Sequence, residues 1–143
     1  MRALLDRNVL LALFDEDHVN HVLARQWLVK HADSGWSSCA LTENGFLRII
    51  SHPSYPNSVS TRQAFDLLDA ARRPETHEFW SAEVSALDAL DRERVHGPKQ
   101  LTDLYLLALA VSRGGRLVTF DHRIPLSAVR GATADHLVMI GAD

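Results

Sequence analysis

Four acidic residues of this chain stand where their carboxylates could work together. Asp6, Glu43 and Asp121 follow short apolar runs, and Asp103 lies in the first turn of a long apolar stretch. Carboxylates that approach one another repel, and their pKa values rise unless a cation neutralises them. Since no lysine is adjacent to any of the four, the pattern favours a hard divalent cation such as Mg²⁺ or Mn²⁺, which prefers oxygen ligands.

Each of these acids also has a purely structural interpretation. Asp6 could cap the helix that follows it. Glu43 and Asp103 each follow a threonine at the start of a helix, where a negative charge complements the helix dipole. Asp121 could be an ordinary turn residue before His122. The shared position favours a site, because helix dipoles do not require acids at the same end of every strand.

The elements that must position the acids alternate between strands and helices. Strands are predicted at Ala3–Leu5, Trp36–Ala40, His77–Trp80, Leu117–Phe120 and Leu137–Ile140. Helices are predicted at Val9–Phe14 with Asn8 as cap, Val19–Ala32, Glu43–Ile50, Thr61–Ala71, Ser85–Leu90 and Leu101–Ser112. This alternation predicts one three-layer α/β/α domain over residues 1–143 with a mainly parallel central sheet. Ligands of such sheets bind beyond the carboxyl ends of the strands, so the four acids should meet at one rim.

The helix over Leu101–Ser112 is the most apolar segment. Its stretch from Leu104 to Val111 carries no charged residue, so the helix should be buried on nearly all sides. Two partners could cover it, namely the sheet of its own chain or a second subunit.

The composition describes an ordinary globular protein. The chain has 143 residues, of which 46% are hydrophobic and 23% charged, and a single cysteine, Cys39. One cysteine cannot form an intramolecular disulfide, and no stretch suits a signal peptide or a membrane span. We therefore expect a soluble cytoplasmic protein that makes no membrane contact. The net charge of −3 argues against a broad basic surface, but setting the four acids aside leaves 15 basic and 14 acidic residues.

The four acids lie within segments that carry a family resemblance. Residues 4–10 (LLDRNVL), 41–46 (LTENGF), 101–110 (LTDLYLLALA) and 117–121 (LVTFD) resemble, in order, the four motifs of PIN-domain proteins. The similarity spans nearly the whole chain and is strongest to the single-domain VapC-type toxins of bacterial toxin–antitoxin pairs.

That resemblance implies a PIN-like fold and a metal-dependent endoribonuclease, the toxin of a type II pair. Such an enzyme hydrolyses RNA phosphodiester bonds with a metal-activated water. It also implies Mg²⁺, or Mn²⁺, as cofactor. The partners would be a cognate VapB-like antitoxin, the RNA substrate and a second copy in a homodimer. The implied catalytic and metal-binding residues are Asp6, Glu43, Asp103 and Asp121, with Asn8 and Thr119 as polar supports.

Arg7 departs from the family pattern, which more often has a small or apolar residue there. Its side chain could face the rim, where it would contact a phosphate or partly neutralise the acids, or it could point to solvent. A PIN-like RNA- or protein-binding module with weak or no catalysis is therefore the main alternative. A haloacid-dehalogenase-type phosphatase needs an aspartate where Asn8 stands. A phosphorelay receiver needs adjacent acids after its first strand and a lysine after a late strand, and this chain has neither where required.

The remaining candidates are single residues. His18 and His21 are spaced for one shared metal, but surface positions are the simpler interpretation because no further ligand is near. Tyr55 lies in a proline-containing loop and could contact RNA or a partner. The aromatic residues Trp27, Phe46, Phe65 and Tyr105 fit helical core positions, His122 fits a turn, and Cys39 fits the core.

Overall fold

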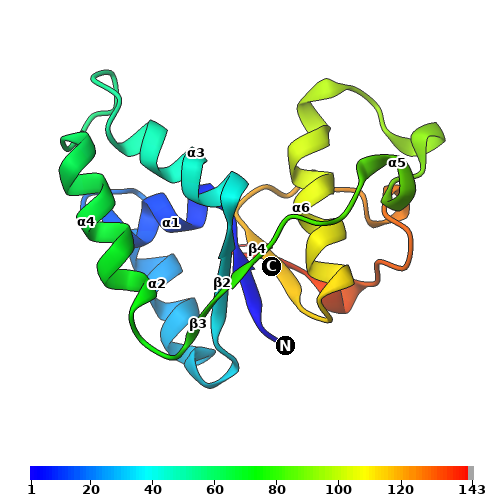
Figure 1. The fold of residues 1–143 in the computed structure, drawn as a ribbon, viewed down its shortest axis with the longest axis horizontal. Helices are drawn as coiled ribbons and strands as arrows, with labels where there is room; N and C mark the ends of the chain where they lie inside the picture. The colour runs from blue at the N-terminus through cyan, green and yellow to red at the C-terminus, as the bar shows by residue number, and fades with distance from the viewer. Residues whose placement is uncertain (142–143) are drawn as a thin grey trace.

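A parallel β-sheet forms the centre of the structure, a computed structural model that describes residues 1–141 (Figure 1). Its five strands lie in the order β3-β2-β1-β4-β5, and every neighbouring pair is parallel. The strands are β1 (Ala3–Leu5), β2 (Trp36–Cys39), β3 (His77–Trp80), β4 (Arg116–Thr119) and β5 (Leu137–Met139). This order differs from the 2-1-3-4-5 order of receiver domains, so the receiver alternative is wrong.

Helices cover both faces of the sheet. One face carries α1 (Arg7–Phe14), α2 (His21–Lys30), α3 (Ala40–Ile50) and α4 (Thr61–Arg72). The other carries α5 (Ala86–Ala89) and α6 (Leu101–Ser112), as Figure 1 shows. The structure therefore confirms the predicted three-layer α/β/α class, with a sheet that is parallel throughout.

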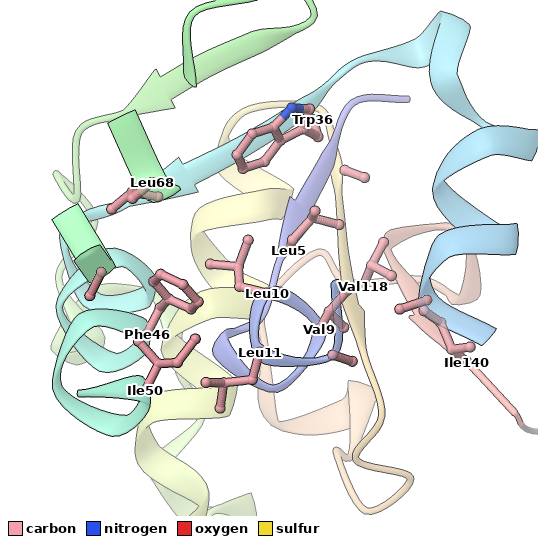
Figure 2. Packing of buried hydrophobic residues seen from close by; sticks show 14 residues of the cluster. Leu5, Val9, Leu10, Leu11, Trp36, Phe46, Ile50, Leu68, Val118 and Ile140 are labelled. Atoms are coloured by element: carbon pink, nitrogen blue, oxygen red, sulfur yellow. The ribbon is translucent and has the colours of Figure 1, made fainter. Parts of the chain in front are cut away.

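Each face of the sheet has its own hydrophobic core, because successive strand residues point to opposite sides. Leu5 packs with Val9 and Phe46 on the side of α1–α4 (Figure 2). Its neighbour Leu4 packs with Trp80 and with the residues of α6 on the other side. The short strand β1 thus packs into both cores. This packing fixes the end of the strand, where Asp6 follows.

The apolar helix α6 is buried by its own chain. Leu104 and residues 106–110 are all buried, and α6 contacts β1, β4 and α5. Of the two partners that the sequence left open, the first is therefore correct, and this helix needs no second subunit. A sharp turn follows at Gly114, whose φ of 66° is favourable for glycine. At Gly115, a Cβ would lie 2.6 Å from the carbonyl oxygen of Arg2.

Several predicted boundaries and placements were wrong. Helix α1 begins at Arg7 with Asp6, not Asn8, as its N-cap. Helix α3 begins at Ala40 instead of Glu43, because the Thr42 hydroxyl accepts a hydrogen bond from the Cys39 backbone N–H at 3.0 Å and satisfies the helix start. Phe65 is 61% exposed and not part of the core.

No helix within residues 1–141 is long and apolar enough to cross a membrane.

Tyr55 has a structural role, and its contact with RNA or a partner stays a prediction. Its hydroxyl donates a hydrogen bond to Oδ2 of Asp15 at 2.6 Å, and its ring packs against the core of α1–α4. Asn57 donates to the other oxygen, Oδ1, at 2.8 Å. Asp15 follows α1 and is itself buried. The two side chains therefore fasten the loop between α3 and α4 to the end of α1.

The stability that the hydrogen bonds of Asp15 contribute should depend on pH. Burial raises the pKa of Asp15, but the hydrogen bonds from Tyr55, Asn57 and the Asp17 backbone outweigh that effect and lower it overall. A carboxyl with a lowered folded-state pKa contributes stability above its unfolded pKa of about 4, and that contribution disappears as the pH falls through the folded value. Tyr55→Phe should lower the free energy of unfolding by about 1 kcal/mol at neutral pH and by less in acid.

Urea denaturation across the pH range measures this loss. Tyr105→Phe is the matched control, because the Tyr105 hydroxyl contacts the backbone of Val84, so any loss there should not vary with acidification. A Tyr55→Phe variant as stable as the parent at neutral pH would contradict the assignment.

Candidate active site

Asp6 combines the two roles considered for it from the sequence. It is buried where β1 ends, and its Oδ1 accepts a hydrogen bond from the backbone N–H of Arg7 at 2.7 Å, so it caps α1. Its Oδ2 accepts from the hydroxyl of Thr119 at 2.8 Å. Burial raises the pKa of Asp6, although these hydrogen bonds oppose the rise. Capping therefore fixes the carboxylate at the carboxyl end of β1.

Thr119 connects the ends of two neighbouring strands. It is the last residue of β4, which pairs with β1 through Leu5 and Val118. Besides donating to Asp6, its Oγ1 accepts hydrogen bonds from Asn8 Nδ2 at 3.3 Å and from the backbone N–H of Asp121 at 3.1 Å. Asn8 and Thr119, which the family resemblance marks as supports, thus both lie at the end of the sheet that carries Asp6 and Asp121.

Asp121 is held by the residue two positions further on. Its Oδ1 accepts from the backbone N–H of Arg123 at 2.9 Å and from the Arg123 Nε at 3.3 Å. Burial raises the pKa of Asp121, but the hydrogen bonds and charge of Arg123 outweigh burial and lower it overall. This carboxylate is therefore ionised over the whole neutral range.

Asp103 carries the strongest mark of crowded negative charge. Burial, followed by the charges of Asp6 and Asp121, raises its pKa from 3.8 to about 6. When protonated, it donates a hydrogen bond to Asp121, which also favours the protonated form. Three of the four predicted acids therefore lie close enough to influence one another, although they come from β1, α6 and the end of β4.

Arg7 lies near this group and is exposed, so both orientations considered from the sequence stay open. Its positive charge lowers the pKa of both Asp6 and Asp103. Its side chain lies over Gly45 of α3, where a Cβ would stand 3.0 Å from Arg7 Cδ. The sequence analysis did not single out Gly45, a glycine inside α3 that no turn explains.

Glu43 lies in a different set of contacts. Its Oε2 accepts a hydrogen bond from the hydroxyl of Ser38 at 2.6 Å, and its carboxylate pairs with Arg72 at 3.1 Å. It is not among the leading causes of the pKa shifts of the three aspartates. Ser38 and Arg72 were not predicted as site residues, since Arg72 comes from α4, 29 positions along the chain.

His77 completes the surroundings of Glu43. Because Ser38 gives its one proton to Glu43, its oxygen accepts from the His77 Nε2–H at 2.8 Å. Burial and the charges of Arg72 and Arg2 lower the pKa of His77 to about 4, so the imidazole is neutral at physiological pH. Ser38 is fully buried and its hydroxyl faces a carboxylate, so this chain of hydrogen bonds orients Glu43 and does not provide a nucleophile.

The donor set of the three aspartates suits a hard divalent cation. All of its ligands would be carboxylate oxygens, and the raised pKa of Asp103 shows that their charges are incompletely neutralised. In the part of the chain that the structure describes, ion pairs involve Asp121 but neither Asp6 nor Asp103. Among these same residues, no three His, Cys, Asp or Glu side chains are gathered tightly enough to hold a metal ion as they stand.

A cavity of about 140 Å³ adjoins the aspartates. Asp103 and Asp121 form one part of its lining, and Lys99, Gln100 and Arg123 form another. Lysine ammonium and arginine guanidinium groups are suited to phosphate. The cavity therefore places cationic and anionic side chains next to each other, as binding of a phosphodiester beside a metal requires.

The remaining single-residue candidates have structural roles. His21 Nδ1 contacts the Ala12 carbonyl at 2.7 Å, and His18 Nδ1 accepts from the Asn20 backbone at 3.0 Å, so the two do not share a ligand. His122 Nε2 lies 3.0 Å from the carbonyl of Ile140 and supports a loop. Cys39 is a fully buried core residue, as predicted.

Comparison with known proteins gives consistent matches over most of the chain. The PIN domain family matches residues 3–131. The chain is 57% identical over 142 residues to Ribonuclease VapC44 of Mycobacterium tuberculosis, an alignment that covers 98% of this chain and all of that protein. It is 42% identical over 120 residues to Ribonuclease VapC38 of the same organism (83% of this chain, 84% of that protein). It is 40% identical over 135 residues to Ribonuclease VapC39, also from that organism (92% and 96%).

The crowding of the aspartates predicts a stability cost in the metal-free protein. The pKa of Asp103 is about 6 in the folded protein, compared with the ordinary aspartate value of 3.8. The folded state therefore binds this proton more tightly than the unfolded chain does. Stability therefore falls as the pH rises between those values. Asp103→Asn should be more stable than the parent at neutral pH by about 1–2 kcal/mol, a value discounted for solvent screening of a half-exposed group.

The measurement is urea denaturation in a chelator at a series of pH values. The gain should disappear in acid below about pH 4, where the parent carboxyl is protonated. Asp33→Asn, at an exposed position, serves as control and should show no such trend. Equal stability of Asp103→Asn and the parent at neutral pH would contradict a raised pKa of Asp103 in the folded protein.

Proposed function

Because this chain belongs to the PIN-domain family of VapC-type ribonucleases, we propose that it is a metal-dependent endoribonuclease and the toxin of a type II toxin–antitoxin pair. The observation that carries the proposal is the meeting of Asp6, Asp103 and Asp121 at the carboxyl end of the sheet, with a pKa of about 6 at Asp103. Ligands of parallel sheets bind at this end. A module that only binds RNA or protein would not require this concentration of negative charge.

We propose Mg²⁺ as the cofactor, with Mn²⁺ as a substitute. Asp6, Asp103 and Asp121 would hold it through carboxylate oxygens, and Glu43 is the fourth acid of the catalytic and metal-binding set. A bound divalent cation supplies a positive charge for the phosphate and lowers the pKa of a water molecule. Thr119 and Asn8 support this role, because the Thr119 hydroxyl donates to the Asp6 carboxylate and Asn8 donates to the Thr119 oxygen.

The reaction is hydrolysis of an RNA phosphodiester. The oxygen of a water molecule forms a bond to phosphorus, the bond from phosphorus to the ribose oxygen of the leaving nucleotide breaks, and that oxygen takes up a proton. The chain binds the phosphate next to the carboxylates and orients it. Lys99 and Arg123 are suited to this task, because both line the cavity that Asp103 and Asp121 also line.

We propose a VapB-like antitoxin as the protein partner. An apolar groove of about 350 Å³ runs beside α2 and supports this choice. Its lining includes Leu13, Leu28 and Val29, of which Val29 is 67% exposed. Exposed aliphatic side chains around a groove are typical of a surface that binds an apolar segment of another protein.

We also propose a homodimer that acts in the cytoplasm, where its RNA substrate is. A second apolar hollow, of about 480 Å³, lies between α5 and the start of α6. Leu87 is 78% exposed and Leu101 45% exposed at its edge. Since α6 itself is covered by its own chain, these side chains are the apolar surface that a second copy would cover.

The first prediction concerns the aspartates. The purified protein, free of antitoxin, should cleave RNA with Mg²⁺ or Mn²⁺, and Asp6→Asn and Asp103→Asn should each reduce cleavage by more than about 100-fold, because each removes a charged metal ligand. Calorimetry should show that the parent binds Mn²⁺ and that both variants have lost this binding. A folded parent protein that binds no Mn²⁺ and cleaves no RNA would favour the binding-module alternative.

The second prediction concerns the phosphate contact. Lys99→Gln should weaken binding of single-stranded RNA about two- to five-fold and make it less salt-dependent, since each lost phosphate contact reduces the salt slope by about 0.7. Lys30→Gln is the matched control, because Lys30 is the other lysine of the chain and ends α2. Fluorescence anisotropy with a single-stranded RNA oligonucleotide in a chelator, where the metal-dependent reaction does not proceed, gives both quantities. Equal effects of the two substitutions would remove Lys99 from the site.

A further inference from the structure

Glu43 is held by two side chains that are not part of the aspartate group. The Ser38 hydroxyl donates to its Oε2 at 2.6 Å, and Arg72 Nη1 lies 3.1 Å from each of its two carboxylate oxygens. Hydrogen bonds to an ionised group are stronger than neutral ones. Glu43 would lose both partners if its carboxylate turned to a metal ion held by the aspartates.

Arg72 is itself fixed in position. Its guanidinium lies 5.1 Å from the centroid of the Phe79 ring, a distance at which a cation is attracted to an aromatic face. The Glu43 side chain is 12% exposed and that of Arg72 is 39% exposed. The carboxylate is therefore largely removed from solvent, whereas its guanidinium partner is partly exposed.

Ser38 also holds the Glu43 carboxylate in this orientation. It lies in β2 beside Phe79 of β3, and its oxygen also accepts the Nε2–H of His77 at 2.8 Å. Its proton is thereby directed to Glu43. All the described contacts of the carboxylate thus come from β2 and α4, whereas Asp6, Asp103 and Asp121 are influenced by one another.

We infer that Arg72 is a positioning residue that holds the Glu43 carboxylate in its contacts with Arg72 and Ser38, so that Glu43 adds little to the metal affinity of the free protein. This inference rests on the proposed function, since it takes Glu43 as the fourth acid of that site. Arg72 competes with the metal for Glu43, and this competition lowers the metal affinity of the free protein.

The test is a double-mutant cycle on Mn²⁺ affinity, measured by calorimetry without RNA. Arg72→Met removes the charge and the donors but keeps the apolar stem over Phe79. It should tighten Mn²⁺ binding about five-fold, within the range of coupling between contacting residues. In the parent, Glu43→Gln should change the affinity less than about two-fold, but in the Arg72→Met background it should abolish the gain.

Two further variants exclude simpler explanations. Arg73→Met is the matched control, because Arg73 is the next residue and pairs with Asp69 instead; its Mn²⁺ affinity should equal that of the parent. Arg72→Lys keeps the charge and should also stay near the parent value. Thermal unfolding checks that each variant is folded.

The outcomes separate this inference from the proposed function. If the parent binds Mn²⁺, Asp103→Asn does not, and Arg72→Met has the parent's affinity or a weaker one, then Arg72 only joins α4 to α3 and the inference is overturned alone. If Arg72→Met tightens binding equally with and without Glu43, the effect is one of overall charge, and the inference is again overturned. If neither the parent nor any variant binds Mn²⁺, the metal site fails and the inference fails with it.

Discussion

Repulsion among three carboxylates is the constraint around which this end of the molecule is organised. Asp6, Asp103 and Asp121 come from three separate elements, and folding brings them together although burial and the neighbouring negative charges raise the pKa of Asp103 to about 6. The fold tolerates this cost because β1 and β4 are fixed by two hydrophobic cores and by the Thr119 hydrogen bonds. A divalent cation would offset the same repulsion, which is why a site built at the expense of stability suits metal-dependent hydrolysis.

A different arginine acts on each part of the acidic group. Arg7 lies on Gly45 and lowers the pKa of Asp6 and Asp103, while Arg123 keeps Asp121 ionised. Arg72 pairs with the fourth acid, Glu43. The net charge of −3 therefore does not describe the site, where arginines stand beside acids in the fold.

Much of the fold follows from the sequence because its signals are local. Short apolar strands and the uncharged stretch of α6 identify the alternating elements, and parallel strands must bring their carboxyl ends to one edge. This reasoning placed three acids together. It missed the surroundings of Glu43, because Ser38, Arg72 and His77 meet only through the packing of β2, β3 and α4. It also missed the hydrogen bond of Tyr55 to Asp15, which lies 40 positions away.

The most direct test of the account is the free energy of unfolding of the parent protein as a function of Mn²⁺ concentration at neutral pH. If the aspartates form a metal site whose repulsion the ion relieves, stability should rise with Mn²⁺ and, above the dissociation constant, gain about 1.4 kcal/mol for each ten-fold increase in concentration. The same unfolding free energy at every Mn²⁺ concentration would contradict the account, because the folded chain would then contain no site that the ion prefers over the unfolded chain.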